Sequence, residues 1–250
     1  MDDALLRLDG VNARYGTGQS LFGVSLAVPR GEIVALLGRN GAGKSTTLRS
    51  IMRIGVRTEG GIWYDGRDLT RLGTTAVARL GIGYVPEDRR IFGRMTVREN
   101  LLLGRYLARG EREAISLDTA LATFPTLEPL LGRRGGVLSG GEQQLLAVAR
   151  SLVGNPQLML LDEPSEGLAP LTLRQVRAAI ESAHATYGVT VLLAEQNATF
   201  ALALASRVVL IDTGRVVFTG ATDELREQPA LMSRYLGVES AGFADEGRPT

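Results

Sequence analysis

A glycine-rich octapeptide carries the clearest chemical signal in this chain. Residues 38–45 read GRNGAGKS and fit the pattern G-x-x-x-x-G-K-[ST] of a phosphate-binding loop. Glycines let the backbone wrap a phosphate with its amides pointing inward, and a helix that begins at the end of the loop adds partial positive charge. The pattern predicts that Lys44 reaches the β- and γ-phosphates of a nucleotide and that the Ser45 hydroxyl binds Mg²⁺.

The lysine of this loop has no counterpart elsewhere in the sequence. Lys44 is the only lysine among 28 basic residues. A compact ammonium kept where all other basic residues are arginine favours a chemical role; chance survival is the alternative. The predicted nucleotide-binding residues of the loop are Gly38, Arg39, Asn40, Gly41, Ala42, Gly43, Lys44, Ser45 and Thr46.

Two acidic residues follow a second apolar run. Residues 158–161 read LMLL and lead into Asp162 and Glu163. At the carboxyl edge of a parallel sheet, Asp162 would help to hold Mg²⁺, directly or through water. Glu163 would polarise a water molecule for in-line attack on a γ-phosphate. The alternative is an acidic helix cap before Pro164, but the pairing with a phosphate loop favours a nucleotide site.

A third motif, LSGGE, covers residues 138–142. Ser139, Gly140 and Gly141 stand at the expected start of a helix, where they form a second site suited to an anion. One chain with one phosphate loop has no obvious use for such a site, so we expect it to serve a nucleotide held by a facing subunit. The alternative is a serine that caps a helix in a flexible turn.

These motifs need a parallel sheet to position them. Short continuous apolar runs predict strands that are covered on both faces, and a late hairpin joins two further strands across Thr213 and Gly214. The predicted strands are residues 33–37, 82–85, 158–161, 189–194, 208–212 and 216–218. Residues 5–28 predict short antiparallel strands at the edge of this core.

Strand signals vanish between about residues 87 and 155, where helical signals dominate. Thr96 and Glu99 form a capping box that predicts a helix to residue 103, and the other predicted helices cover residues 43–54, 111–124 and 142–153,. We therefore predict an α/β P-loop NTPase core with an antiparallel β edge and an inserted helical subdomain. The predicted domain spans residues 1–237, with its core at about 1–86 and 156–237, the helical subdomain at about 87–155, and a disordered tail at 238–250.

Composition excludes several classes of protein. The chain has 250 residues, 44% of them hydrophobic, and a formal net charge of +1. It can therefore bury a core, and it lacks the strong positive charge of a dedicated nucleic-acid binder. It has no cysteine, which excludes disulfides and thiolate chemistry. The first residues predict no signal peptide and no apolar run is long enough to span a membrane, so we expect a soluble chain.

The order and spacing of GRNGAGKST, LSGGE and LMLLDEP resemble those of the nucleotide-binding subunits of ABC transporters. The resemblance covers about residues 5–237, nearly the whole chain. It implies that ATP and Mg²⁺ are the cofactors, and that Tyr15 stacks on adenine rather than being an ordinary strand tyrosine. It also implies that two subunits close head to tail around two ATP molecules, each held between one phosphate loop and the Ser139 loop of the other subunit.

Three positions depart from the general family pattern. Glu87 stands where most members have a glutamine, Gln196 where a histidine is usual, and Ala169 where the dimer loop is usually acidic. Glu87 can still bind Mg²⁺ through an oxygen and Gln196 can still donate a hydrogen bond to the γ-phosphate, so we expect an active ATPase. The only histidine, His184, is expected on the surface. The resemblance implies catalytic roles for Glu163, Gln196 and Lys44 and a metal site of Ser45, Glu87 and Asp162.

The departures themselves resemble one branch of the family. YVPEDRRIF, PSEGLAP and LLAEQN are similar to the LivF branch, the second ATPase subunit of branched-chain amino acid importers. This implies an ATPase on the cytoplasmic face of the cell membrane, in which ATP closes a dimer and hydrolysis reopens it. The implied partners are two multi-span permease subunits, a second ATPase subunit and, indirectly, a periplasmic or extracellular solute-binding protein. A heterodimer is favoured over a homodimer, and no nucleic acid is expected.

Arginines gather in the sequence just after Glu87. The resemblance implies that Glu87 and the helical subdomain dock a cytoplasmic loop of the permease, and the arginines would take part in that contact. A solvated basic face is the equal alternative. The arginines are Arg89, Arg90, Arg94 and Arg98.

Other functions stay open on the sequence alone. Related importers of urea and short amides carry close variants of these motifs, and an exporter such as a lipopolysaccharide pump shares the fold. A soluble ABC ATPase acting on nucleic acid or ribosomes would bring a long coiled-coil insertion or a second cassette, and the sequence has neither. A small-molecule kinase would leave the Ser139 loop and a water-activating Glu163 unexplained.

Overall fold

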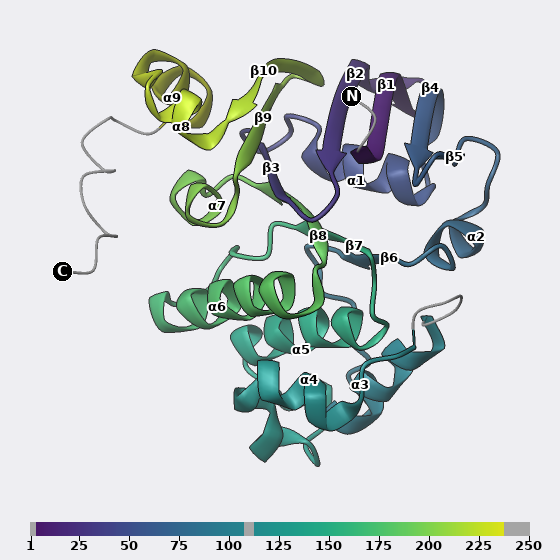
Figure 1. The fold of residues 1–250 in the computed structure, drawn as a ribbon, viewed down its shortest axis with the longest axis vertical. Helices are drawn as coiled ribbons and strands as arrows, with labels where there is room; N and C mark the ends of the chain where they lie inside the picture. The colour runs from purple at the N-terminus through teal and green to yellow at the C-terminus, as the bar shows by residue number, and fades with distance from the viewer. Residues whose placement is uncertain (1–3, 108–112, 238–250) are drawn as a thin grey trace.

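Two β-sheets and a group of helices make up the fold (Figure 1). The computed structural model describes residues 4–107 and 113–237. The first sheet is antiparallel, in the order β2-β1-β4-β5. Its strands are β1 (Ala4–Tyr15), β2 (Gly18–Pro29), β4 (Arg57–Tyr64) and β5 (Arg67–Asp68).

The second sheet is the one that the apolar runs predict. Its order is β10-β9-β3-β8-β7-β6, with β3, β6, β7, β8 and β9 parallel and β10 antiparallel to β9. The strands are β3 (Ile33–Leu37), β6 (Ile82–Val85), β7 (Leu158–Asp162), β8 (Thr190–Glu195), β9 (Arg207–Asp212) and β10 (Arg215–Ala221). The predicted α/β class with an antiparallel edge is confirmed.

The central sheet is buried on both faces because helices cover one side and the antiparallel sheet with α1 (Lys44–Met52) covers the other. All five residues of β3 are buried. Its alternate side chains divide between two cores: Ile33, Ala35 and Leu37 join the helical side, while Val34 and Leu36 join the other. This is why the strand reads as a continuous apolar run rather than as an alternating one.

The antiparallel part differs from its prediction. Short strands over residues 5–28 were expected, but β1 and β2 are twelve residues long each and form a separate sheet with β4. The sequence does not reveal β4, because its first five residues read RTEGG and only Ile62–Tyr64 are apolar. A Cβ at Gly60 would lie 2.5 Å from the carbonyl oxygen of Gly10, and one at Gly61 would overlap the Trp63 ring. Close packing favours glycine at these positions. Because glycine is uncommon inside strands, the sequence pattern does not predict β4.

The helices that follow β6 lie together at the end of the molecule opposite the antiparallel sheet (Figure 1). They are α3 (Val97–Gly104), α4 (Leu117–Thr123) and α5 (Gly140–Val153), joined by the 3₁₀ helices η1 (Arg105–Leu107), η2 (Pro125–Leu130) and η3 (Gly135–Val137). The remaining helices are α2 (Thr74–Ala78), α6 (Pro170–Tyr187), α7 (Ala198–Leu204), α8 (Thr222–Arg226) and α9 (Pro229–Leu236). Within the two described ranges, no helix is long and apolar enough to cross a membrane.

Several predicted boundaries shift. The helix expected over 111–124 begins only at Leu117, because Ser116 accepts a hydrogen bond from the Thr119 amide and caps the helix there; residues 111 and 112 lie outside the described part. The helix expected from residue 142 begins at Gly140, directly after its cap, Ser139. The first helix ends at Met52 rather than at 54. The tail predicted over 238–250 also lies outside the described residues.

The capping box of α3 leads to a test of stability. The Thr96 hydroxyl accepts from the Glu99 amide at 3.2 Å, and the Glu99 carboxylate accepts from the Thr96 amide at 2.7 Å. We expect Thr96→Ala to lower the free energy of unfolding by about 1 kcal/mol, measured by urea denaturation. The matched control is Thr186→Ala in α6, where the threonine is exposed and the described residues offer its hydroxyl no hydrogen bond. An equal loss in both variants would contradict the capping role.

Candidate functional site

The glycine-rich loop joins β3 to α1 and leaves the head of that helix open. Its N-cap, Gly43, has a φ of 111° and offers no side-chain hydrogen bond to the first turn of α1. A Cβ at Gly43 would lie 2.7 Å from Leu21, and one at Gly38 would lie 2.3 Å from the carbonyl oxygen of Ile211. Only glycine fits both places. The amides of the first turn are therefore available to an anion.

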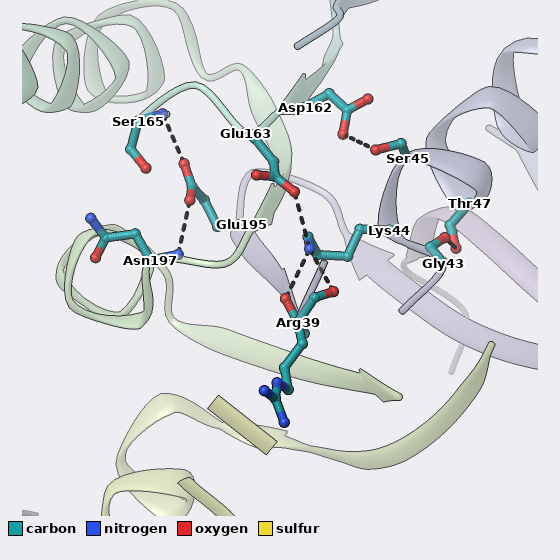
Figure 2. A network of polar contacts seen from close by, with 11 residues as sticks. Arg39, Gly43, Lys44, Ser45, Thr47, Asp162, Glu163, Ser165, Glu195 and Asn197 are labelled. Carbon is teal, nitrogen blue, oxygen red and sulfur yellow. Dashed lines mark hydrogen bonds and ion pairs between the residues drawn. The ribbon is translucent and has the colours of Figure 1, made fainter. Parts of the chain in front are cut away.

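Lys44 folds back over this loop (Figure 2). Its ammonium donates to the carbonyl oxygens of Gly38 at 2.8 Å and Arg39 at 3.1 Å, and it pairs with Glu163 Oε1 at 3.1 Å. The Lys44 side chain is 3% exposed. Three acceptors match the three N–H groups of an ammonium. A phosphate at the loop would therefore lie beside the fixed ammonium of Lys44, which in this structure pairs with the Glu163 carboxylate.

Asp162, at the end of β7, faces the first turn of α1. It is fully buried; Ser45 Oγ donates to its Oδ1 at 2.8 Å and the Tyr84 hydroxyl donates to its Oδ2 at 3.1 Å. Burial raises the pKa of the Asp162 carboxyl, against the lowering effect of the Ser45 and Tyr84 hydroxyls. Burial and the neighbouring Asp162 raise the pKa of the Tyr84 hydroxyl. The adjacent oxygens of Ser45 and Asp162 suit the hard ligand preference of Mg²⁺.

Glu163 sits in an uncommon backbone conformation. Its φ is 48°, in the left-handed region that few non-glycine residues occupy,. Its amide donates to the carbonyl oxygen of Ala194 at 2.8 Å, which ties the end of β7 to β8. Strained conformations of this kind persist where surrounding contacts hold them, and they concentrate at functional sites. Here the turn places the carboxylate beside Lys44.

Glu195 is a site residue that the sequence analysis missed. Its carboxylate accepts from the Ser165 amide at 2.9 Å and from the Asn197 amide at 3.1 Å, so it joins the loops after β7 and β8 (Figure 2). Burial, at 1% exposure, raises its pKa to about 7. The sequence feature that could have indicated Glu195 is an acidic residue at the end of an apolar strand, as at Asp162. Gln196, next to it, is exposed at the carboxyl end of β8.

A cavity of about 360 Å³ lies over the loop. Besides the glycine-rich loop and the predicted Glu163, it is lined by residues that sequence reasoning did not assign to the site. Its lining residues are Gln19, Ser20, Phe22, Gly41, Gly43, Lys44, Ser45, Thr46, Glu163 and Thr213. Tyr15 is not among them: it is 39% exposed at the end of β1, and its hydrogen bond with Arg49 raises the pKa of that guanidinium.

The remaining predicted site residues lie outside this cavity. Ser139 is exposed at the head of α5, where it and Glu142 form a capping box, with Gly140 and Gly141 in the first turn. Glu87 is exposed in the loop after β6. Burial and the charges of Glu163 and Glu87 raise the pKa of Glu166, so Glu87 stands close to the acidic end of the site. One chain brings Lys44, Ser45, Asp162 and Glu163 together and leaves the Ser139 loop apart.

Comparison with known proteins decides the family. The family model for ABC transporters matches residues 21–166, more than half of the chain. The chain belongs to the ABC transporter family. Over 233 residues, this ABC protein is 42% identical to the high-affinity branched-chain amino acid transport ATP-binding protein BraG of Pseudomonas aeruginosa, across 93% of the chain and all of BraG. A "probable branched-chain amino acid transport ATP-binding protein LivF" of Archaeoglobus fulgidus is 35% identical, across 94% of the chain and 99% of that protein.

Solved structures agree with this assignment. An ATP-binding subunit of an ABC transporter superposes with a TM-score of 0.76 at 29% identity, over 93% of this chain and 96% of that one. The predicted P-loop NTPase fold of an ABC ATPase is thereby confirmed. As a member of this family, the ABC protein is an ATP-binding and ATP-hydrolysing subunit.

The ammonium of Lys44 gives a direct test of the loop. We expect Lys44→Ala to weaken ATP binding by about two orders of magnitude or more, because charge-assisted hydrogen bonds to phosphate are lost. Isothermal titration calorimetry with ATP and Mg²⁺ measures this. Arg67→Ala is the control, because it also removes a positive charge but lies exposed in β5, outside the loop and the cavity. Tight ATP binding by Lys44→Ala would refute the loop assignment.

Glu195 makes stability depend on pH. Its pKa of about 7, against an ordinary 4.5, means that the folded protein binds more protons than the unfolded chain between these values. The stabilisation is therefore complete below about pH 4.5 and lost as the pH rises through 7. We expect the free energy of unfolding to fall by up to about 3 kcal/mol through this group between pH 5 and pH 8.

Urea denaturation across this pH range checks the expectation. Glu195→Gln should lack this part of the pH dependence. The control is His184→Ala, which removes the one histidine of the sequence. His184 is half-buried in α6, with Nδ1 2.9 Å from the Val189 carbonyl oxygen, and does not line the cavity over the loop. An unchanged pH profile in Glu195→Gln would show that Glu195 is not the titrating group.

Proposed function

We propose that this chain is the ATP-hydrolysing subunit of a membrane importer for branched-chain or other hydrophobic amino acids. The observation that carries the catalytic part is the contact between Glu163 and Lys44 at the mouth of the phosphate loop, beside Ser45 and Asp162. The identity of 42% with BraG over the whole length of BraG supports the substrate class, ahead of a urea or amide importer, an exporter or a soluble ABC ATPase.

The residues divide the chemistry between them. The loop amides and Lys44 bind the β- and γ-phosphates of ATP, and Tyr15 stacks on the adenine. Ser45, Asp162 and Glu87 would hold Mg²⁺, which would supply positive charge against the negative charge that develops on the phosphates. Glu163 accepts a proton from the attacking water, and Gln196 donates a hydrogen bond to the γ-phosphate.

Lys44 also prepares Glu163 for this role. When the ammonium turns to a phosphate, the carboxylate loses its partner at 3.1 Å and becomes free to accept a hydrogen bond from water. The left-handed turn at Glu163, fixed by its amide bond to Ala194, keeps the carboxylate at the cavity wall. No imidazole takes part in this proton transfer.

The Ser139 loop, the second predicted anion site, would complete the nucleotide site of the facing subunit. In the proposed dimer, two subunits face each other head to tail, and Ser139 and Gly140 of one chain bind the phosphates held by the other. Two features support this: Ser139 is exposed, and it does not line the cavity of its own chain. ATP closes the dimer, and hydrolysis reopens it. We favour a heterodimer with a related ATPase subunit over a homodimer.

Closing and reopening the dimer would drive the membrane partners. We propose two multi-span permease subunits, with a solute-binding protein acting through them, so that the ATPase lies on the cytoplasmic face of the membrane and contacts no nucleic acid. Arg90, Arg94 and Arg98 are exposed, as is Phe92. A mixed basic and aromatic surface of this kind suits a loop of a permease that carries acidic and apolar side chains.

Glu163→Gln separates binding from hydrolysis. We expect it to bind ATP with wild-type affinity, to hydrolyse it about 10²–10⁴-fold more slowly because the general base is lost, and to persist as a closed dimer with ATP in size-exclusion chromatography. Glu59→Gln is the control, because Glu59 is an exposed acid of β4 that does not line the cavity, and it should hydrolyse ATP normally. Wild-type turnover in Glu163→Gln would remove this residue from the role of base.

The same variant tests the biological assignment. Tagged Glu163→Gln is recovered with ATP and Mg²⁺ from detergent-solubilised native membranes, and the co-purifying chains are identified by mass spectrometry. Two multi-span proteins and a second ATPase would support the importer, and the adjoining solute-binding protein would narrow the solute. Recovery of ribosomal or DNA-associated proteins instead would keep the family and overturn the function.

A further inference from the structure

The loop after β6 contains two consecutive residues in the left-handed region. Arg89 has a φ of 59° and Arg90 a φ of 44°. Neither is glycine, so neighbouring contacts must hold this conformation. The loop runs from Glu87, a proposed Mg²⁺ ligand, to Thr96, the cap of α3. Its anchoring therefore decides where Glu87 is placed.

Arg89 is anchored by α5 at both its side chain and its backbone. Its Nε donates to Gln144 Oε1 at 3.0 Å, and its carbonyl oxygen accepts from Arg150 Nη2 at 3.2 Å. Gln144 is 2% exposed, one turn beyond the Ser139 loop. A hydrogen bond to a buried acceptor is more specific than one at the surface, because the acceptor has no water to replace it.

The guanidinium also reaches the first turn of α5. A Cβ at Gly140 would lie 3.2 Å from Arg89 Nη1. Arg89 thus runs along α5 from Gln144 to Gly140, and it contacts the motif that we propose faces the second nucleotide. The left-handed turn turns the side chain toward this helix.

The rest of the loop is held by α3. Asn100 is fully buried; its Oδ1 accepts from the Phe92 amide at 2.9 Å, and its Nδ2 donates to the carbonyl oxygens of Phe92 and Thr96 at 3.0 Å each. Arg150 Nη1 lies 3.5 Å from the same Oδ1. The loop is therefore fastened to the helices of the insertion, whereas Asp162 and Glu163 belong to the central sheet.

Arg90 provides an internal comparison. It shares the left-handed backbone, but its side chain is exposed and pairs with Asp88 on the same loop. Of these two neighbouring arginines, only Arg89 forms a hydrogen bond with α5 among the described residues.

We propose that Arg89 is a positioning residue that locks the Glu87 loop to the head of α5, so that Glu87 and the Ser139 loop move as one unit. The functional consequence of this contact, a movement of the Ser139 loop at the nucleotide of the facing subunit, rests on the proposed dimer. A change at the Glu87 loop, on the side of the permease partner, would then displace the Ser139 loop, which binds the nucleotide of the facing subunit. Losing Arg89 should uncouple the two without touching the phosphate loop.

Backbone hydrogen exchange tests the lock in the single chain. Arg89→Ala and its matched control, Arg90→Ala, are compared with the parent by mass spectrometry of peptides that cover residues 87–92 and 139–143. We expect Arg89→Ala to speed exchange in both segments, by about five-fold or more for one lost hydrogen bond, and Arg90→Ala to leave residues 139–143 unchanged. Unchanged exchange at 139–143 in Arg89→Ala would overturn the proposal.

The functional consequence is read in the Glu163→Gln background. We expect Arg89→Ala to raise the ATP concentration at the midpoint of dimer formation about five-fold, while the ATP affinity of the single subunit stays at the parent value. Gln144→Met removes the acceptor at similar volume, and should match this shift. The double variant should add little to either single one, since both remove the same bond.

The outcomes separate this proposal from the proposed function. If the Glu163→Gln protein never dimerises with ATP, the proposed dimer is refuted. The exchange measurement would still test whether Arg89 holds the Glu87 loop against α5. A normal dimer midpoint in Arg89→Ala, with a lowered melting temperature, would show a merely structural contact and overturn the positioning role. Equal shifts in Arg89→Ala and Arg90→Ala would also overturn it, because the effect would then follow loop charge.

Discussion

The buried ammonium of Lys44 is the interaction on which the site depends. A charge at 3% exposure is unfavourable unless acceptors surround it, and this one has two carbonyl oxygens of its own loop and the carboxylate of Glu163. The loop supplies its acceptors only because Gly38 and Gly43 let the backbone pass close to Ile211 and Leu21. Glu163 supplies the third only because β7 ends at the same edge of the sheet as β3. The strand order therefore places the carboxylate that follows β7 within reach of Lys44.

That edge is stiffened from within the sheet. β8 lies between β3 and β7, so the two strands that carry the chemistry never pair directly, and β8 must transmit their register. It does so through Ala194, which accepts from the Glu163 amide, and through Glu195, whose carboxylate gathers the amides of Ser165 and Asn197. A carboxyl group that is buried, with its pKa raised to about 7, is costly unless polar groups contact it. Here they hold the loop after Glu163 against the loop that carries Gln196.

The sequence predicts those parts of the site whose function depends on a local motif or on a local pattern of apolar residues. The loop motif, the strands 33–37 and 82–85, and the pair Asp162 and Glu163 were all predicted, because continuous apolar runs and glycine-rich turns are local signals of buried parallel strands and phosphate loops. β4 was missed, since Gly60 and Gly61 are required by contacts with Gly10 and Trp63 that no local pattern contains. Glu195 and Gln144 were missed for the same reason: their roles depend on partners that the fold brings from distant segments.

The glycines of the Ser139 loop show how one motif can satisfy two demands. A Cβ at Gly141 would lie 2.3 Å from Thr172 of α6, so packing within one chain already requires that glycine; a Cβ at Gly140 would lie 3.2 Å from the Arg89 guanidinium, which would have to shift slightly. Glycines at the head of a helix also let a phosphate approach the backbone amides of the first turn closely. The two demands are compatible because Arg89 and Thr172 close the flanks of that turn and leave Ser139 exposed. In the proposed dimer, the nucleotide of the second subunit would therefore approach from the side of Ser139. There the Glu142 amide donates a long hydrogen bond, of 3.3 Å, to Ser139 Oγ. This weak contact is the one most easily exchanged for a hydrogen bond to a phosphate oxygen.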